Sequence, residues 1–159
     1  MQLAADPELA VLHPRTLHRR EALERDLVRL AGPDWRSEID PVPATAAYAA
    51  RIREVAEAGW AAGIVAHHYT RYLGDLAGGQ VIARRMAAQF DLDGDGVAFY
   101  DFADLGDIGE FRGRYRAALD ALGARLDAAE QERMLDEVRA AYGPNTAVFV
   151  DLERARVAG

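Results

Sequence analysis

One stretch of the chain decides its fold: HHYTRYLGDLAGGQ, residues 67–80. Apolar side chains recur through it at spacings of three and four, which is typical of one face of an α-helix. These positions are Val65, Tyr69, Tyr72 and Leu76. We predict one continuous helix from about Trp60 to Phe90.

Three glycines lie inside the stretch 67–80, and each costs a helix roughly 1 kcal/mol relative to alanine. Gly74 and Gly78 are four residues apart, so they share one face and leave a strip of bare backbone there. Either a second helix packs closely on this strip or a flat ligand lies against it. Arg71 and Asp75 border the same face, which favours the ligand.

The stretch from Tyr69 to Gln80 resembles the distal-helix signature of heme oxygenases, with YxRYLGDLxGGQ as its body. Weaker likeness extends to Leu17–Leu27 upstream and to the Phe111 and Asn145 regions downstream. The resemblance covers about residues 17–153. It implies an all-α, heme oxygenase-like fold of about five helices in a single domain over residues 1–159, without the N-terminal segment of the family.

The function that this resemblance implies is that of a monooxygenase. Such an enzyme cleaves heme, its cofactor and substrate, with O2 and electrons from a reductase, and releases biliverdin, iron and carbon monoxide. The implied catalytic residues are Arg71, Gly74, Asp75 and Gly78. The implied heme-binding residues are Tyr69, Thr70, Arg71, Gly74, Gly78, Arg112, Arg116, Tyr142, Asn145 and Phe149.

The resemblance also gives each group a role. Asp75 would order water for proton delivery, with Arg71 in the same polar network. Arg112 and Arg116 are four apart on one helix face and would hold the two propionates, while the three residues of the last helix would wall the pocket.

No residue of this chain inherits the role of iron ligand, because the family's proximal histidine lies upstream of the part that resembles Leu17–Leu27. His18 matches another family position, and His67 and His68 lie on the distal side. Three interpretations stay open: a shortened sequence of an ordinary enzyme, a degenerate helical module that binds heme or dimerises without catalysis, or a homodimer that fills the groove with a second copy.

Composition narrows the class of protein. Half of the 159 residues are apolar, which suffices for one domain with a sizeable core, and cysteine is absent. A net charge of -7 argues against a nucleic-acid partner. No apolar run is long enough to span a membrane and no signal peptide is evident, so we expect a cytoplasmic protein without a membrane partner.

The remaining chain predicts an irregular lead-in over residues 1–15 and helices over about 16–30, 44–58, 108–122 and from 127 onward. His13 and His18 are expected at the surface. Apolar spacing predicts inward-facing stripes on three of these helices. They comprise Leu17, Leu23, Leu27 and Leu30; Tyr48, Ile52 and Val55; and Leu135, Val138, Tyr142, Asn145, Phe149 and Leu152.

Three local signals complete the analysis. Asp127 and Glu130 form a capping pair, and Gly143-Pro144 predicts a bend at residues 140–144. The acidic segment 91–96 copies half of a calcium loop, but its twelfth position is Phe102, so we expect no metal there. Aromatic residues should instead pack this segment down as a turn.

Overall fold

The computed structural model describes residues 10–158, which form helices and connecting loops without a strand among them. The all-α prediction is therefore confirmed for this part of the chain. The longer elements are α2 (Arg20–Ala31), α4 (Pro43–Glu57), α5 (Ala61–His68), η3 (Tyr69–Leu73), α6 (Gly74–Phe90), α7 (Ile108–Arg125) and α8 (Ala128–Ala158). The shorter ones, which were not predicted, are η2 (Arg15–Leu17), α3 (Trp35–Glu38), η4 (Ala98–Tyr100) and η5 (Ala103–Leu105).

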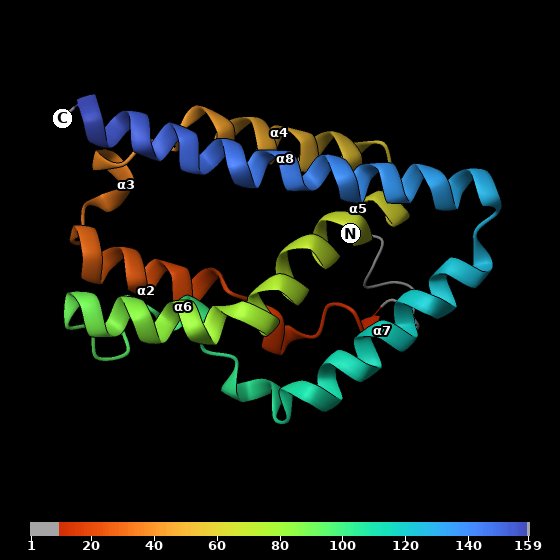
Figure 1. Ribbon diagram of the computed structural model, residues 1–159, viewed down its shortest axis with the longest axis horizontal. Coiled ribbons are helices and arrows are strands. Elements are labelled where there is room, and N and C mark those ends of the chain that lie inside the picture. Colours follow the sequence, from red (N-terminus) through yellow and green to blue (C-terminus); the bar gives the residue numbers. More distant parts are fainter. Residues whose placement is uncertain (1–9, 159) are drawn as a thin grey trace.

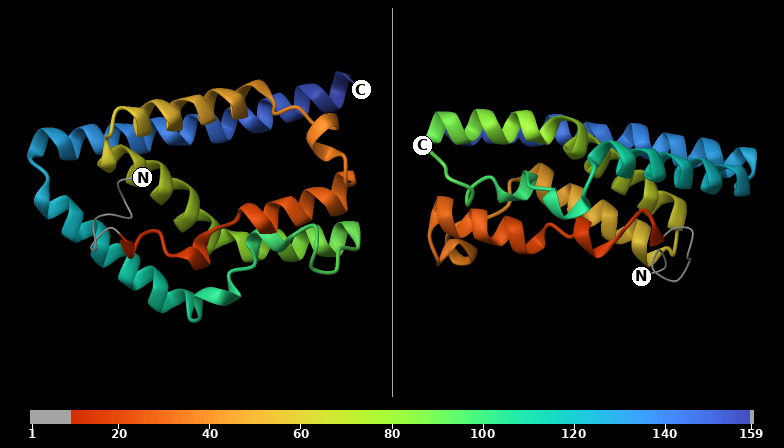
Figure 2. Two further views of the ribbon diagram at one scale, coloured as in Figure 1. Left: turned by 180° about the vertical axis from the view of Figure 1, so that it is seen from behind. Right: turned by 90° about the horizontal axis from the view of Figure 1, so that it is seen from below.

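Two groups of helices are linked by the central helix (Figure 1). α4 and α8 run side by side along one edge, and α5 packs against both of them (Figures 1 and 2). From there the chain runs through η3 into α6 at the opposite edge, where α6 and α2 both contact η4. No helix within residues 10–158 is long and apolar enough to cross a membrane.

The central helix follows the prediction from Ala61 to Phe90, but it contains a turn of π-helix, η3, at Tyr69–Leu73. A π-turn inserts one extra residue into the helical ladder and is frequent at functional sites. Arg71 lies in this turn, and Gly74 follows it directly. The turn therefore sets the direction in which these residues face.

The largest cluster of buried apolar residues joins the lead-in, the central helix, η5 and α7. Its members are Leu12, Leu17, Val65, Leu76, Phe102, Phe111, Tyr115 and Leu122. Leu12 is fully buried, so the lead-in contributes to the core, which its irregular sequence did not predict. Residues 1–9 of the predicted lead-in lie outside the described residues.

Only half of the predicted stripe of the first helix is correct. Leu17 is buried and Leu27 is partly buried, whereas Leu23 and Leu30 are 43% and 53% exposed. The buried residues of α2 are Ala22 and Asp26. The reason is that α2 packs on the polar backbone of the η4 region. Three backbone N–H groups of this region donate hydrogen bonds to the Asp26 carboxylate. The face of α2 that carries Asp26 is therefore buried instead of the face that carries Leu23 and Leu30.

Asp26 is the anchor that the sequence analysis missed. Its buried carboxylate accepts hydrogen bonds from the backbone N–H groups of Gly96, Ala98 and Phe99, at 2.7, 2.9 and 2.7 Å. Phe102 is buried behind them, as predicted. The described residues contain no group of acidic or histidine side chains arranged to hold a metal ion.

The predicted stripe of α8 is also exposed in most of its members, because the neighbouring face, which carries the buried residues Glu137 and Ala141, packs on α4 and α5. On α4 the prediction holds for Val55, which is buried. α8 continues through Pro144 as one helix, so the predicted bend does not interrupt it.

The capping pair at the start of α8 is formed in one direction. Asp127 Oδ1 accepts a hydrogen bond of 2.8 Å from the backbone N–H of Glu130. The Glu130 carboxylate accepts instead from the indole N–H of Trp60, which Arg133 covers at 3.7 Å from the ring. The start of α8 is thereby joined to the start of α5.

Candidate functional site

The glycine strip on α6 is open. A Cβ atom added at Gly74 or at Gly78 would meet no atom within 4 Å outside the neighbouring helical backbone. A Cβ added at Gly79 would lie 2.6 Å from Cδ1 of Tyr100. Close packing therefore accounts for Gly79, whereas Gly74 and Gly78 border free space, as a ligand would require.

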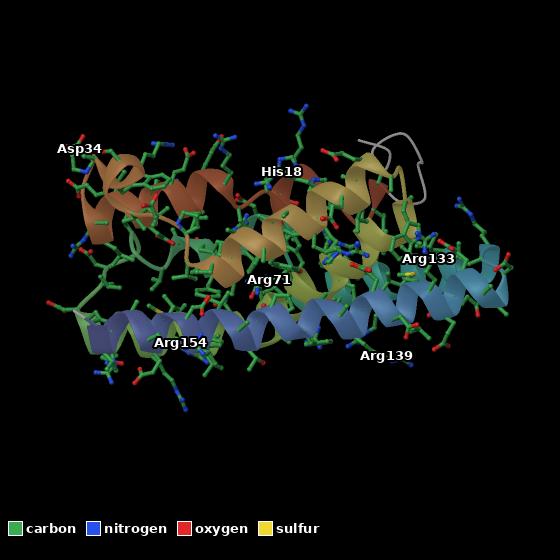
Figure 3. The ribbon with its side chains drawn as sticks, turned by 90° about the horizontal axis from the view of Figure 1, so that it is seen from above. His18, Asp34, Arg71, Arg133, Arg139 and Arg154 are labelled. Atoms are coloured by element: carbon green, nitrogen blue, oxygen red, sulfur yellow. The ribbon has the colours of Figure 1, made fainter. Side chains whose placement is uncertain are left out.

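Arg71 connects this strip with α8. Its Nη1 atom donates a hydrogen bond of 2.6 Å to Oδ1 of Asn145. In the view of Figure 3 the label of Arg71 lies beside the ribbon of α8, in agreement with this contact. The contact joins two residues that were predicted in the same site from distant parts of the sequence. It also gives Asn145 the hydrogen-bond partner that a polar residue on an apolar stripe needs.

Asp75 lies one helical turn beyond Arg71. Burial raises the pKa of its carboxyl group, and the nearby positive charge of Arg71 opposes part of that rise. The carboxyl group is partly buried beside an open strip. Such a group retains a proton at a higher pH than an exposed aspartate does, which suits an exchange of protons with a neighbour.

Three phenol groups lie within the electrostatic reach of Arg71. Burial raises the pKa of Tyr48, Tyr72 and Tyr100, and the charge of Arg71 lowers each of these pKa values in part. Tyr48 was predicted only as an inward-facing residue, because nothing in its local sequence indicates a site 23 positions downstream in η3.

Two predicted heme-binding residues of η3 have structural contacts. Thr70 is buried, and its hydroxyl donates to the carbonyl of Ala66 at 2.9 Å. Tyr69 packs against the core cluster. Neither contact leads to the glycine strip.

The wall residues of α8 present apolar area to the exterior. Tyr142 and Phe149 are 54% and 74% exposed. On α7, Arg116 is exposed and Arg112 is partly buried, with its Nε atom unpartnered. No hydrogen bond, ion pair or ring contact within residues 10–158 joins either arginine to the strip, so their predicted role toward propionates stays a prediction.

All four histidines contact protein groups. His13 lies between His18 and His68, at 3.1 and 3.3 Å between ring nitrogens, and His68 Nδ1 is 2.8 Å from the hydroxyl of Tyr115. His67 contacts Tyr48 and Glu137. His13 and His18 are exposed, as predicted, although they contact each other.

Together, the fold and this geometry define an all-α protein with a bare helical strip, bordered by a carboxyl group and a guanidinium, that is open to a flat ligand. Comparison with known proteins gives the class a name. The family model for heme oxygenase matches residues 2–151, and the chain belongs to that family.

Individual relatives agree with this assignment. The chain is 42% identical to heme oxygenase 1 of Nostoc sp. over 148 residues, which covers 92% of the chain and 61% of the relative. It is 40% identical to heme oxygenase 1 of Synechocystis sp., with coverage of 92% and 60%. The chain therefore spans about three fifths of the length of these relatives.

Solved structures share the fold. The crystal structure of heme oxygenase-1 from the cyanobacterium Synechocystis sp. in complex with heme has a TM-score of 0.87 and 37% identity, over 99% of this chain and 70% of that one. The heme oxygenase of Leptospira interrogans gives a TM-score of 0.83 at 33% identity, over 93% and 71%.

Proposed function

We propose that this chain acts as a heme oxygenase, a monooxygenase that cleaves heme with O2 and reductase electrons to biliverdin, iron and carbon monoxide. The observation that carries the proposal is the open strip at Gly74 and Gly78, beside Asp75 and the Arg71–Asn145 hydrogen bond. Family membership and the likeness to a structure in complex with heme support it. We also propose that this activity is cytoplasmic.

The residues present fit a flat tetrapyrrole. Backbone at the strip admits a planar group that any larger side chain would exclude, and Tyr142 and Phe149 offer apolar area. Arg112 and Arg116 would hold the propionates, since a guanidinium group can bind a carboxylate through two parallel hydrogen bonds. Bound heme would supply the iron at which O2 is activated for cleavage of the macrocycle.

The polar residues then have distinct tasks. Asn145 holds Arg71 in place, and the fixed positive charge of Arg71 lies near Asp75. Asp75, whose pKa burial raises, can take up a proton and pass it to ordered water. A preorganised charge beside a proton carrier is the arrangement expected of a site that directs protons to one place.

A hemin titration tests binding. We expect the wild-type chain to give a sharp Soret band, whereas Gly74→Leu, which fills the strip, should weaken hemin binding at least tenfold. Gly123→Leu is the matched control because a Cβ at Gly123 on α7 also meets no atom within 4 Å. If Gly74→Leu binds hemin as the control does, the strip is not the binding surface.

A turnover assay tests chemistry. We expect ascorbate or a reductase to convert hemin bound to the wild-type chain to biliverdin, with loss of the Soret band. Asp75→Ala should retain hemin and lose biliverdin formation. A broad free-hemin spectrum of the wild-type chain would favour the non-catalytic helical module, and undiminished biliverdin formation in Asp75→Ala would exclude the role of Asp75.

Two protein partners follow from the proposal. A reductase must supply electrons, and the exposed apolar residues of α8 offer a surface on which a second copy of the chain can dock. If hemin and the second copy use the same surface, hemin should shift a dimer to monomer. Sedimentation velocity with and without hemin measures this, and a dimer unaffected by hemin would place self-association elsewhere.

A further inference from the structure

A buried series of polar side chains begins at Tyr48. The Tyr48 hydroxyl is 3.2 Å from Nδ1 of His67, and Nε2 of the same ring is 2.9 Å from Oε1 of Glu137. His67 and Glu137 are only 4% and 6% exposed. Arg51 binds both oxygens of Glu137, at 2.9 and 2.6 Å. The series joins α4, α5 and α8.

The charge of Glu137 fixes where the proton of His67 resides. Hydrogen bonds from Arg51 lower the pKa of Glu137, so this group is an anion. Nε2 of His67 lies 2.9 Å from Oε1 of this anion. A bare nitrogen lone pair at 2.9 Å from a carboxylate would be repelled, so Nε2 must carry the hydrogen.

It follows that Nδ1 is an acceptor. Burial lowers the pKa of His67, which keeps the ring neutral with one hydrogen only. The Tyr48 hydroxyl must then donate its single proton to Nδ1, and only the lone pairs of its oxygen are left to face the site. These lone pairs suit Arg71, since a guanidinium has donors and no acceptor.

We infer that His67 is a positioning residue which, held by Glu137, commits Tyr48 to accept rather than donate hydrogen bonds toward Arg71. Its significance for heme chemistry rests on the proposed function. With Tyr48 in this state, any further group that bonds to the phenol oxygen, a guanidinium or a water, has to act as the donor.

The test reads the tautomer directly and needs no heme. In uniformly 15N- and 13C-labelled protein, the ring-nitrogen shifts of His67 at neutral pH should show the Nε2–H form in at least tenfold excess. Tyr48→Phe should leave this excess unchanged, because Glu137 and not the phenol determines it. Glu137→Gln should reduce the excess at least several-fold, because the neutral amide no longer repels a bare Nε2.

Three results would overturn the inference: an Nδ1–H tautomer in the wild type, a change of tautomer in Tyr48→Phe, or an unchanged ratio in Glu137→Gln. If Glu137→Gln does not fold, the wild type and Tyr48→Phe still decide. Failure of the wild-type chain to bind hemin would remove the proposed function while leaving the tautomer assignment intact. Hemin binding with the wrong tautomer would remove only the inference.

Discussion

Arg71 and Asn145 are joined by a hydrogen bond of 2.6 Å between Nη1 and Oδ1, which ties the π-turn of the central helix to α8. The two residues are 74 positions apart in the sequence. The contact holds the guanidinium, whose positive charge acts on Asp75. Its strength therefore determines how firmly the charge of the site is held.

A double-mutant cycle measures this strength. In the heme-free chain, Arg71→Ala and Asn145→Ala should show a coupling of about 0.5–1.5 kcal/mol in the free energy of unfolding, because the bond is charged on one side but exposed to water. Urea denaturation of the four proteins gives the value. Additive effects of the two substitutions would mean that the contact contributes no stability.

The glycines of α6 offer a matched comparison. Gly78→Ala should raise the free energy of unfolding by up to about 1 kcal/mol, since alanine favours the helix and the added methyl meets free space. Gly79→Ala should lower it by about 1–3 kcal/mol, since the methyl would collide with Tyr100. Urea midpoints measure both, and effects of the same sign would refute the contrast between open and packed glycines.

Asp26 gives a large predicted effect. Asp26→Ala leaves three buried backbone N–H groups without an acceptor and should cost about 2–4 kcal/mol of stability. Asp104→Ala, at an exposed position of η5, is the control and should change stability by less than about 0.5 kcal/mol. Chemical denaturation of the two variants checks this, and equal losses would contradict the anchoring role of Asp26.

His68 predicts a dependence on pH. Burial lowers its pKa to about 3 in the folded chain, against 6.5 when exposed. Between these values the unfolded chain binds a proton that the folded chain does not, so stability should decrease by roughly 1.4 kcal/mol for each unit by which the pH is lowered, from this group alone. Well above pH 6.5 His68 is neutral in both states and does not change the free energy of unfolding with pH.

The variant His68→Gln isolates this contribution. It should flatten the loss of stability between pH 6.5 and 4 relative to the wild type, while the contributions of the other buried groups persist in both proteins. Unfolding measured at several pH values gives the difference. Parallel curves for the two proteins would show that His68 is not held neutral by the fold.

The extent to which the sequence predicted this structure depended on whether the signal was local. Helical periodicity and the glycine spacing identified the central helix and its open face, and the family resemblance joined Arg71 with Asn145. Asp26 is buried instead of the leucines of α2 because it binds backbone N–H groups about 70 residues away. The spacing of apolar residues within one helix gives no information about such a distant contact. The π-turn and the link from Glu137 through His67 to Tyr48 also depend on contacts between distant segments.

The π-turn has a consequence for evolution and engineering. One residue of an α-helix corresponds to a rotation of about 100°, so a deletion within 69–73 that restored regular winding would swing everything after it around the helix axis. Gly79 would then lose its match to Tyr100, and the exposed backbone would point elsewhere. An insertion or deletion of even one residue in this segment should therefore be tolerated far less than a substitution that keeps its length.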